Sequence, residues 1–80
     1  MEPSLVEDRV RQILAGILEV DPGQIDPSFG PARADGWDSF ANLRIISALE
    51  REFALKLGWE EIQQMTDFSR IVTALSRRVP

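Results

Sequence analysis

One stretch decides how this chain folds: residues 36–53, which read GWDSFANLRIISALEREF. The Asp-Ser pair near its start is typical of the first residues of a helix, and no proline or glycine follows Gly36 in the stretch. We therefore predict a helix over residues 39–53, with Asp38 as its N-cap. Apolar residues at helical spacing predict the stripe that faces the core, namely Leu43, Ile46, Leu49 and Phe53, with Ile45 beside it.

Length and composition restrict the classes of function. The 80 residues are expected to form one domain, residues 1–80, and an apolar content of 44% is enough for a small core. The chain contains neither cysteine nor histidine, which excludes a disulfide, a thiolate metal site and a Ser-His-Asp triad within it. Its acidic residues are scattered, so we expect no metal site. The net charge of −4 argues against a nucleic-acid partner, which requires a basic face.

The hydrophobicity and the ends of the chain bear on where it works. No apolar run approaches the ~18 residues that span a membrane, and the N-terminal residues lack the pattern of a signal peptide. We expect a monomeric cytoplasmic protein without a membrane partner. The initial Met1 and the short termini favour a free-standing chain over a piece of a larger protein.

A first helix is predicted over residues 5–19. Ser4 and Glu7 have the spacing of a capping box, with Ser4 as the N-cap. Glu7 also precedes Arg11 by four residues, which is the order that favours an ion pair on a helix. Apolar residues at helical spacing predict its core-facing stripe, which comprises Val6, Val10, Ile13 and Ile17, flanked by Leu14 and Leu18.

Residues 21–37 contain three prolines and three glycines, which is too many for a long helix. Apolar residues are nevertheless spaced through this region, at Val20, Ile25 and Phe29. We predict a long ordered loop that these three side chains pin to the core, and a short helical turn over residues 22–25 is left open. A loop of this length in a small domain is uncommon and often functional.

Two further helices are predicted after a connection at residues 54–58, in which either Leu55 or Leu57 faces inward. Residues 59–64 suffice for a short helix, and acidic residues charge its start as the helix dipole favours. A last helix is predicted to begin at Phe68 after a cap at Thr66 or Asp67. Its core-facing residues are Phe68, Ile71, Val72 and Leu75, and its last turn carries Arg77 and Arg78. No strand pattern competes, so the predicted fold is an all-α bundle of three longer helices and a short third one.

Several side chains around residue 39 are candidates for function. On a helical wheel Phe40 falls on the polar side with Arg44, Ser47 and Arg51, so it is either a contact point for another molecule or packed against the long loop. Ser39 has no histidine to activate it, but another enzyme can modify it. A phosphate there would lie at a helix N-terminus, where free N–H groups favour negative charge.

The two tryptophans of the chain have different predicted roles. Trp37 is predicted to close the end of the bundle beside Ser39. Two roles stay open for Trp59, which either covers the core or belongs to a contact surface.

The chain as a whole resembles the acyl carrier protein family. The resemblance depends on many residues at matching spacing along the chain, and the Asp-Ser pair alone would not suffice for it. The matching residues run through the entire sequence: Val20, Asp21, Pro22, Ile25, Phe29, the Gly36–Phe40 stretch, Leu43, Ile46, Ala48, Leu49, Glu50, Phe53, Leu57, Glu60, Glu61, Ile62, Phe68, Ile71 and Val72.

The resemblance implies a carrier with no catalytic activity of its own. It implies a four-helix bundle in which Ser39 carries 4′-phosphopantetheine through a phosphodiester, installed from coenzyme A by a phosphopantetheinyl transferase that recognises a motif including Asp38. The thiol of the arm would hold acyl or aminoacyl groups as thioesters. A loading ligase and downstream synthase or transferase enzymes would be its partners, and the helices would shield the cargo between encounters.

The resemblance also implies a recognition surface on the helix after Ser39, made of Asp38, Phe40, Arg44, Ser47, Glu50 and Arg51. Fatty-acid carriers of the family tend to be acidic along this face and to have a leucine after the serine, whereas this chain has two arginines and Phe40. A specialised carrier in a lipid, polyketide or peptide pathway therefore fits better than fatty-acid synthesis. The alternative is a carrier-like interaction module in which Ser39 only starts a helix, and a serine hydrolase is disfavoured because the chain has no base.

Overall fold

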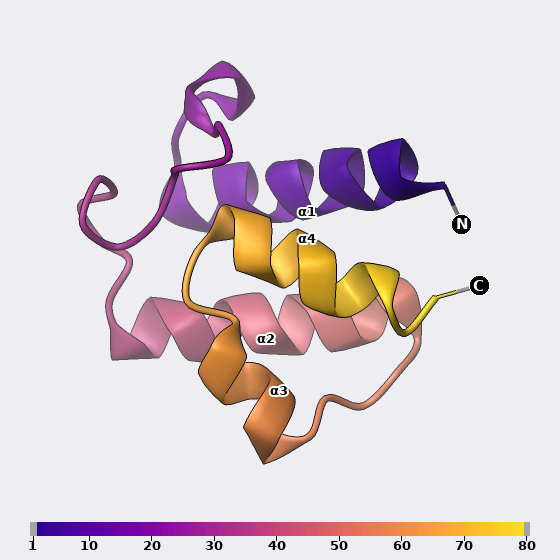
Figure 1. The fold of residues 1–80 in the computed structure, drawn as a ribbon. Helices are drawn as coiled ribbons and strands as arrows, with labels where there is room; N and C mark the ends of the chain where they lie inside the picture. The colour runs from indigo at the N-terminus through magenta and orange to yellow at the C-terminus, as the bar shows by residue number, and fades with distance from the viewer. Residues whose placement is uncertain (1, 80) are drawn as a thin grey trace.

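The structure, a computed structural model, describes residues 2–79, which contain four α-helices, one 3-10 turn and no strand. Figure 1 shows α1 packed beside α4 and running antiparallel to α2, with the shorter α3 crossing at a steep angle next to α2. The predicted all-α bundle with a short third helix is confirmed. None of the described helices combines the length and the apolar character that crossing a membrane requires. The elements are α1 (Pro3–Leu18), η1 (Pro22–Gln24), α2 (Ser39–Phe53), α3 (Trp59–Gln64) and α4 (Phe68–Ser76).

The start of α1 differs from the prediction. The helix begins at Pro3, with Glu2 as an N-cap whose side chain makes no capping hydrogen bond, so the predicted Ser4–Glu7 capping box is wrong. Proline suits the first helical position because its φ is already helical and its missing N–H would have had no partner there. The predicted pair of Glu7 and Arg11 does form, with 2.8 Å between the carboxylate and the guanidinium.

The core lies where α1 packs against α2 and α4. On α1 the fully buried residues are Val6, Val10 and Leu14, whereas Ile13 and Ile17 lie at its edge and are only partly buried. The inward stripe is therefore rotated toward Leu14 relative to the prediction. The other fully buried side chains that meet it are Ile45, Leu49, Met65, Phe68, Ile71 and Leu75.

The inner face of α2 also differs from the predicted stripe, because Leu43 is 67% exposed. At about 100° per residue, Leu43 lies about 160° around the helix from Ile45, which is fully buried. The face that packs follows i, i+4 steps through Ile45 and Leu49, so the choice of Leu43 as a core residue was wrong. The buried residues of α2 are Ala41, Ile45, Ile46, Leu49 and Phe53.

The loop between α1 and α2 is ordered and pinned as predicted. Ile25 and Phe29 are buried and Val20 is partly buried, and residues 22–24 form the short turn η1. The carbonyl of Phe29 accepts a 2.9 Å hydrogen bond from the N–H of Phe68, which ties the loop to the start of α4. Gly36 has a φ of 90°, a conformation that suits glycine, and it turns the chain into Trp37 and the N-cap of α2.

The C-terminal third confirms most of the prediction and corrects one detail. Leu57 rather than Leu55 is the buried residue of the connection, and Asp67 rather than Thr66 caps α4 by accepting from the N–H of Arg70 at 2.8 Å. The helix ends at Ser76, so Arg77 and Arg78 lie beyond its last turn and were wrongly placed within it.

Arg78 instead spans back to the start of α3. Its guanidinium donates to the Glu61 carboxylate and, at 3.0 Å, to the carbonyl of Lys56. The hydrogen bond from Arg78, with a second from the N–H of Gly58, holds the pKa of Glu61 below its ordinary value of 4.5. This pair joins the tail of the chain to the short helix α3.

A pH dependence follows from the lowered pKa of Glu61. Because the folded chain favours the ionised form of Glu61, the pair of Glu61 and Arg78 stabilises the folded chain above about pH 4.5. This stabilisation is lost as the pH falls through the lowered pKa of Glu61. We expect the Glu61→Gln variant to melt at a lower temperature than the native chain at pH 7, and the difference to shrink in acid. Thermal melts at several pH values measure it, and a difference that persists unchanged below pH 3 would contradict the assignment.

Candidate functional site

The N-terminus of α2 leaves the Ser39 hydroxyl free. The Asp38 carboxylate caps the helix by accepting from the N–H of Ala41 at 2.8 Å, and its carbonyl accepts from the N–H of Asn42 at 2.9 Å. Ser39 is exposed, and within residues 2–79 no hydrogen bond engages its hydroxyl. Since the first four N–H groups of a helix have no partner inside it, those of Ser39 and Phe40 stay available to a ligand. The predicted cap at Asp38 is confirmed.

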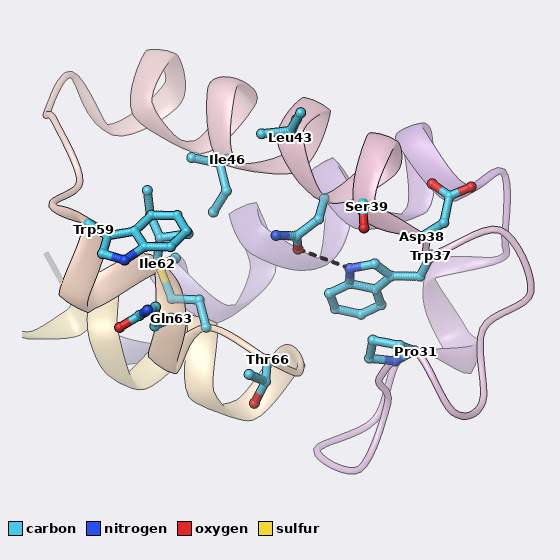
Figure 2. A pocket seen from close by; sticks show the side chains of 12 residues that line it. Pro31, Trp37, Asp38, Ser39, Leu43, Ile46, Trp59, Ile62, Gln63 and Thr66 are labelled. Carbon is cyan, nitrogen blue, oxygen red and sulfur yellow. Dashed lines mark hydrogen bonds between the residues drawn. The ribbon is translucent and has the colours of Figure 1, made fainter.

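An open hollow of about 640 Å³ begins at Ser39 and runs between α2 and α3 (Figure 2). Ser39 and Trp37 lie at one end of it and Trp59 at the other, and the Ser39 hydroxyl points toward the hollow. We call it the α2–α3 groove. Its volume lies within the range of small-molecule sites. Its lining is largely apolar, with a few amides and hydroxyls: Pro31, Trp37, Asp38, Ser39, Asn42, Leu43, Ile46, Trp59, Ile62, Gln63, Met65 and Thr66.

Trp37 forms the end of the groove beside Ser39, which confirms its predicted place. It is only 6% exposed, and its ring centre lies 6.0 Å from that of Phe29 in the loop. Its indole N–H donates to the side-chain oxygen of Asn42 at 3.1 Å, one turn along α2 (Figure 2). The long loop is thereby fixed against the helix start at the position where Ser39 is presented.

A second surface lies on another side of α2. Phe40 is 71% exposed, so it does not pack against the loop, and Arg44, Ser47 and Arg51 are exposed on the same side as predicted. We call these four residues the outer face of α2. Glu50 does not belong to it, because its carboxylate accepts from the N–H of Leu57 at 2.9 Å and so fixes the connection to α3.

Sequence reasoning did not find the α2–α3 groove. Its walls come from four separate segments, represented by Pro31, Leu43, Trp59 and Thr66, and no local pattern reports that these meet. Leu43 was assigned to the core, although its exposure places it at the groove edge. For Trp59, at 71% exposure, the structure favours the surface over the core, and it lines the groove.

Comparison with known proteins agrees with this architecture. No family model matches the chain. The chain is 28% identical over 79 residues to an acyl carrier protein of Thermosynechococcus vestitus, covering 99% of this chain and 98% of that protein. It is 29% identical over 72 residues to an acyl carrier protein of Cyanidioschyzon merolae, covering 90% of this chain and 79% of that protein. The chain is thus similar to acyl carrier proteins over most of its length.

This similarity supports a carrier role rather than that of an enzyme. Acyl carrier proteins carry 4′-phosphopantetheine and serve biosynthetic enzymes, and a phosphopantetheinyl transferase equips them. Among residues 2–79 of this carrier protein, no three His, Cys, Asp or Glu side chains are grouped so that they could hold a metal ion.

Asp38 and Ser39 are adjacent at the start of α2, but we expect their replacement by alanine to change the free energy of unfolding by different amounts. Asp38→Ala should lower the free energy of unfolding by about 1 kcal/mol, because Ala41 loses the acceptor of its N–H. Ser39→Ala should change it by less than about 0.5 kcal/mol, since that hydroxyl is exposed and not bonded. Urea unfolding followed by circular dichroism compares them, and equal losses in both variants would mean that Ser39 shares the capping role.

Proposed function

We propose that Ser39 carries the 4′-phosphopantetheine arm of this acyl carrier protein. The observation that supports it most is the division of labour at the start of α2: Asp38 caps the helix, which leaves the exposed Ser39 hydroxyl without a structural task. A phosphodiester on this oxygen would lie next to the N–H groups of Ser39 and Phe40, and the helix dipole favours negative charge there. The Asp38 carboxylate turns away from the Ser39 hydroxyl, which limits its repulsion of that charge (Figure 2).

The α2–α3 groove supports the same role, because it starts at Ser39 and is walled by apolar side chains. When attached, the arm would supply a thiol that holds an acyl or aminoacyl group as a thioester. Leu43, Ile46 and Trp59 would cover the apolar part of a cargo folded back along the groove. Because the groove is open along its length, the cargo would leave it without unfolding of a helix.

The partners would be a phosphopantetheinyl transferase, a loading ligase and the synthases or transferases that receive the cargo. We infer a specialised lipid, polyketide or peptide pathway rather than fatty-acid synthesis. Arg44 and Arg51 lie beside an exposed Phe40 on the face where the resemblance leads us to expect acidic side chains in a fatty-acid carrier. Asp38 would serve transferase recognition. Glu50 is a weaker candidate for the recognition surface, since its carboxylate already binds the N–H of Leu57.

The test is the intact mass of the chain after incubation with coenzyme A and a broad-specificity phosphopantetheinyl transferase. We expect the native chain to gain the mass of one phosphopantetheine and Ser39→Ala to gain none. Ser69→Ala is the matched control, because Ser69 is an exposed serine in the first turn of another helix, α4, and it should load like the native chain. Absence of loading with several transferases would reject the proposal and favour the alternative of an interaction module in which Phe40 or Arg44 binds a partner.

A further inference from the structure

The basic side chains of this protein differ in whether they form ion pairs with carboxylates of the same chain. The sequence contains nine lysines and arginines, and five of them form ion pairs within residues 2–79: Arg9, Arg11, Arg33, Arg70 and Arg78. The remaining four, Arg44, Arg51, Lys56 and Arg77, form none in that part of the chain and are all exposed. Three of these four lie on α2 or directly after it.

These three cations belong to one continuous surface. Arg44 and Arg51 flank Ser47 on the outer face of α2 and line a shallow hollow with it. Ser47 and Arg51 also line the next hollow, which extends to Lys56. A positive strip therefore runs along this side of a chain whose net charge is −4.

The two nearest carboxylates on α2 form no ion pair with Arg44 or Arg51 within residues 2–79. Glu50 lines the second hollow beside Arg51 and Lys56, and its carboxylate accepts from the N–H of Leu57 at 2.9 Å. Glu52 points to α1, where its carboxylate lies 3.3 Å from the guanidinium of Arg9. The guanidinium groups of Arg44 and Arg51 are therefore available to pair with carboxylates of another molecule.

Part of this strip would lie under an enzyme of ordinary interface size that is centred on Ser39. A standard interface covers about 800 Å² on each partner, which corresponds to a radius of roughly 16 Å around the reacting atom. At about 1.5 Å per helical residue, Arg44 lies about 8 Å along α2 from Ser39 and Arg51 about 18 Å. Phe40, next to Ser39, is exposed enough to serve as the apolar anchor of such an interface. Arg44 would lie inside the contact area and Arg51 at its rim.

We propose that the outer face of α2 docks enzymes whose contact surface is acidic, a proposal that rests on the carrier function at Ser39. Phe40 provides the apolar contact, and Arg44, with Arg51 further away, selects carboxylates on the enzyme. Charges of opposite sign on two surfaces accelerate their encounter, and like charges slow it. An enzyme with a basic docking surface is disfavoured by the same residues.

A charge-swap experiment tests the proposal. The probes are a phosphopantetheinyl transferase with a basic docking surface and its variant in which those basic residues are replaced by glutamate. Loading of Ser39 from coenzyme A is followed by intact mass at low and at high salt. The concentration of the chain is kept below its KM, so that the rate reports kcat/KM. We expect the native chain to load about 10-fold faster with the acidic variant than with the basic parent at low salt, and this preference to fall as salt screens the charges.

The chain offers a matched control for the strip. Arg44→Glu should reverse the preference and Arg51→Glu should weaken it less, because Arg51 is further from Ser39. Arg77→Glu makes the same change of net charge at the end of α4, at another exposed arginine that forms no ion pair within residues 2–79. It should leave the preference within about 2-fold of the native value.

The outcomes separate the two proposals. Loading that proceeds equally with both transferases, or that Arg77→Glu alters as much as Arg44→Glu, overturns the acidic-partner assignment and leaves the carrier function standing. Loading by neither transferase overturns the carrier function and this inference with it. The comparison of the native chain at two salt concentrations requires no substitution in the chain, so it holds even where a variant fails to fold.

Discussion

Replacing Phe68 by alanine is expected to remove much of the stability of the fold, about 3–5 kcal/mol. Phe68 is 2% exposed and opens α4, where the Arg11 guanidinium lies 5.0 Å from its ring centre. Its N–H is also the group that binds the carbonyl of Phe29 in the long loop. At roughly 0.05–0.15 kcal/mol per residue, a chain of this size has about 4–12 kcal/mol in total, so the loss is severe.

Urea unfolding followed by helical circular dichroism measures this loss. The matched control is Phe40→Ala, which makes the same chemical change at a phenylalanine that is 71% exposed, and it should cost less than about 0.5 kcal/mol. Similar losses in the two variants would contradict the packing described for α4. The control also shows whether Phe40 can be used as a docking probe without disturbing the fold.

Trp37→Ala is the second large expected effect, because it removes the side chain that joins the loop to the start of α2. We expect a loss of about 3–5 kcal/mol in unfolding free energy and slower loading of Ser39, since the groove end that presents the serine is no longer held. Trp37→Phe keeps an aromatic ring but removes the indole N–H that donates to the side-chain oxygen of Asn42. We expect this change to lower the free energy of unfolding by about 0.5–1.5 kcal/mol.

Trp59 is the matched control for Trp37. It lines the same groove but is 71% exposed, so Trp59→Ala should change the stability by less than about 0.5 kcal/mol. Fluorescence of the Trp59→Phe chain then reports on Trp37 alone, because the chain has two tryptophans. Equal destabilisation by Trp37→Ala and Trp59→Ala would show that the loop is not held by Trp37.

Residues that act through local chemistry could be predicted from the sequence. The caps at Asp38 and Asp67 bind N–H groups three residues ahead, so they are visible in a short window. The start of α1 was misjudged because Ser4 competed with Pro3, whose preference for the first helical position prevailed. Leu43 was misjudged because i, i+3 and i, i+4 spacing both predict a helical stripe, and only packing against α1 decides between them.

Features that depend on distant segments could not be predicted. The contact of Arg78 with Glu61 joins residues 17 positions apart, and nothing in the sequence near either residue indicates it. The groove requires the loop, α2, α3 and the connection between α3 and α4 to be placed together before it exists. The position of Ser39 could be predicted because one helix start defines it, whereas the space that would receive its cargo could not.

The exposure of Leu43 has one more consequence. This side chain lines both the groove on one flank of α2 and the shallow hollow beside Arg44 on the other, so it forms the crest between them. An enzyme bound on the arginine side would therefore touch the same leucine that a cargo lying in the groove would contact.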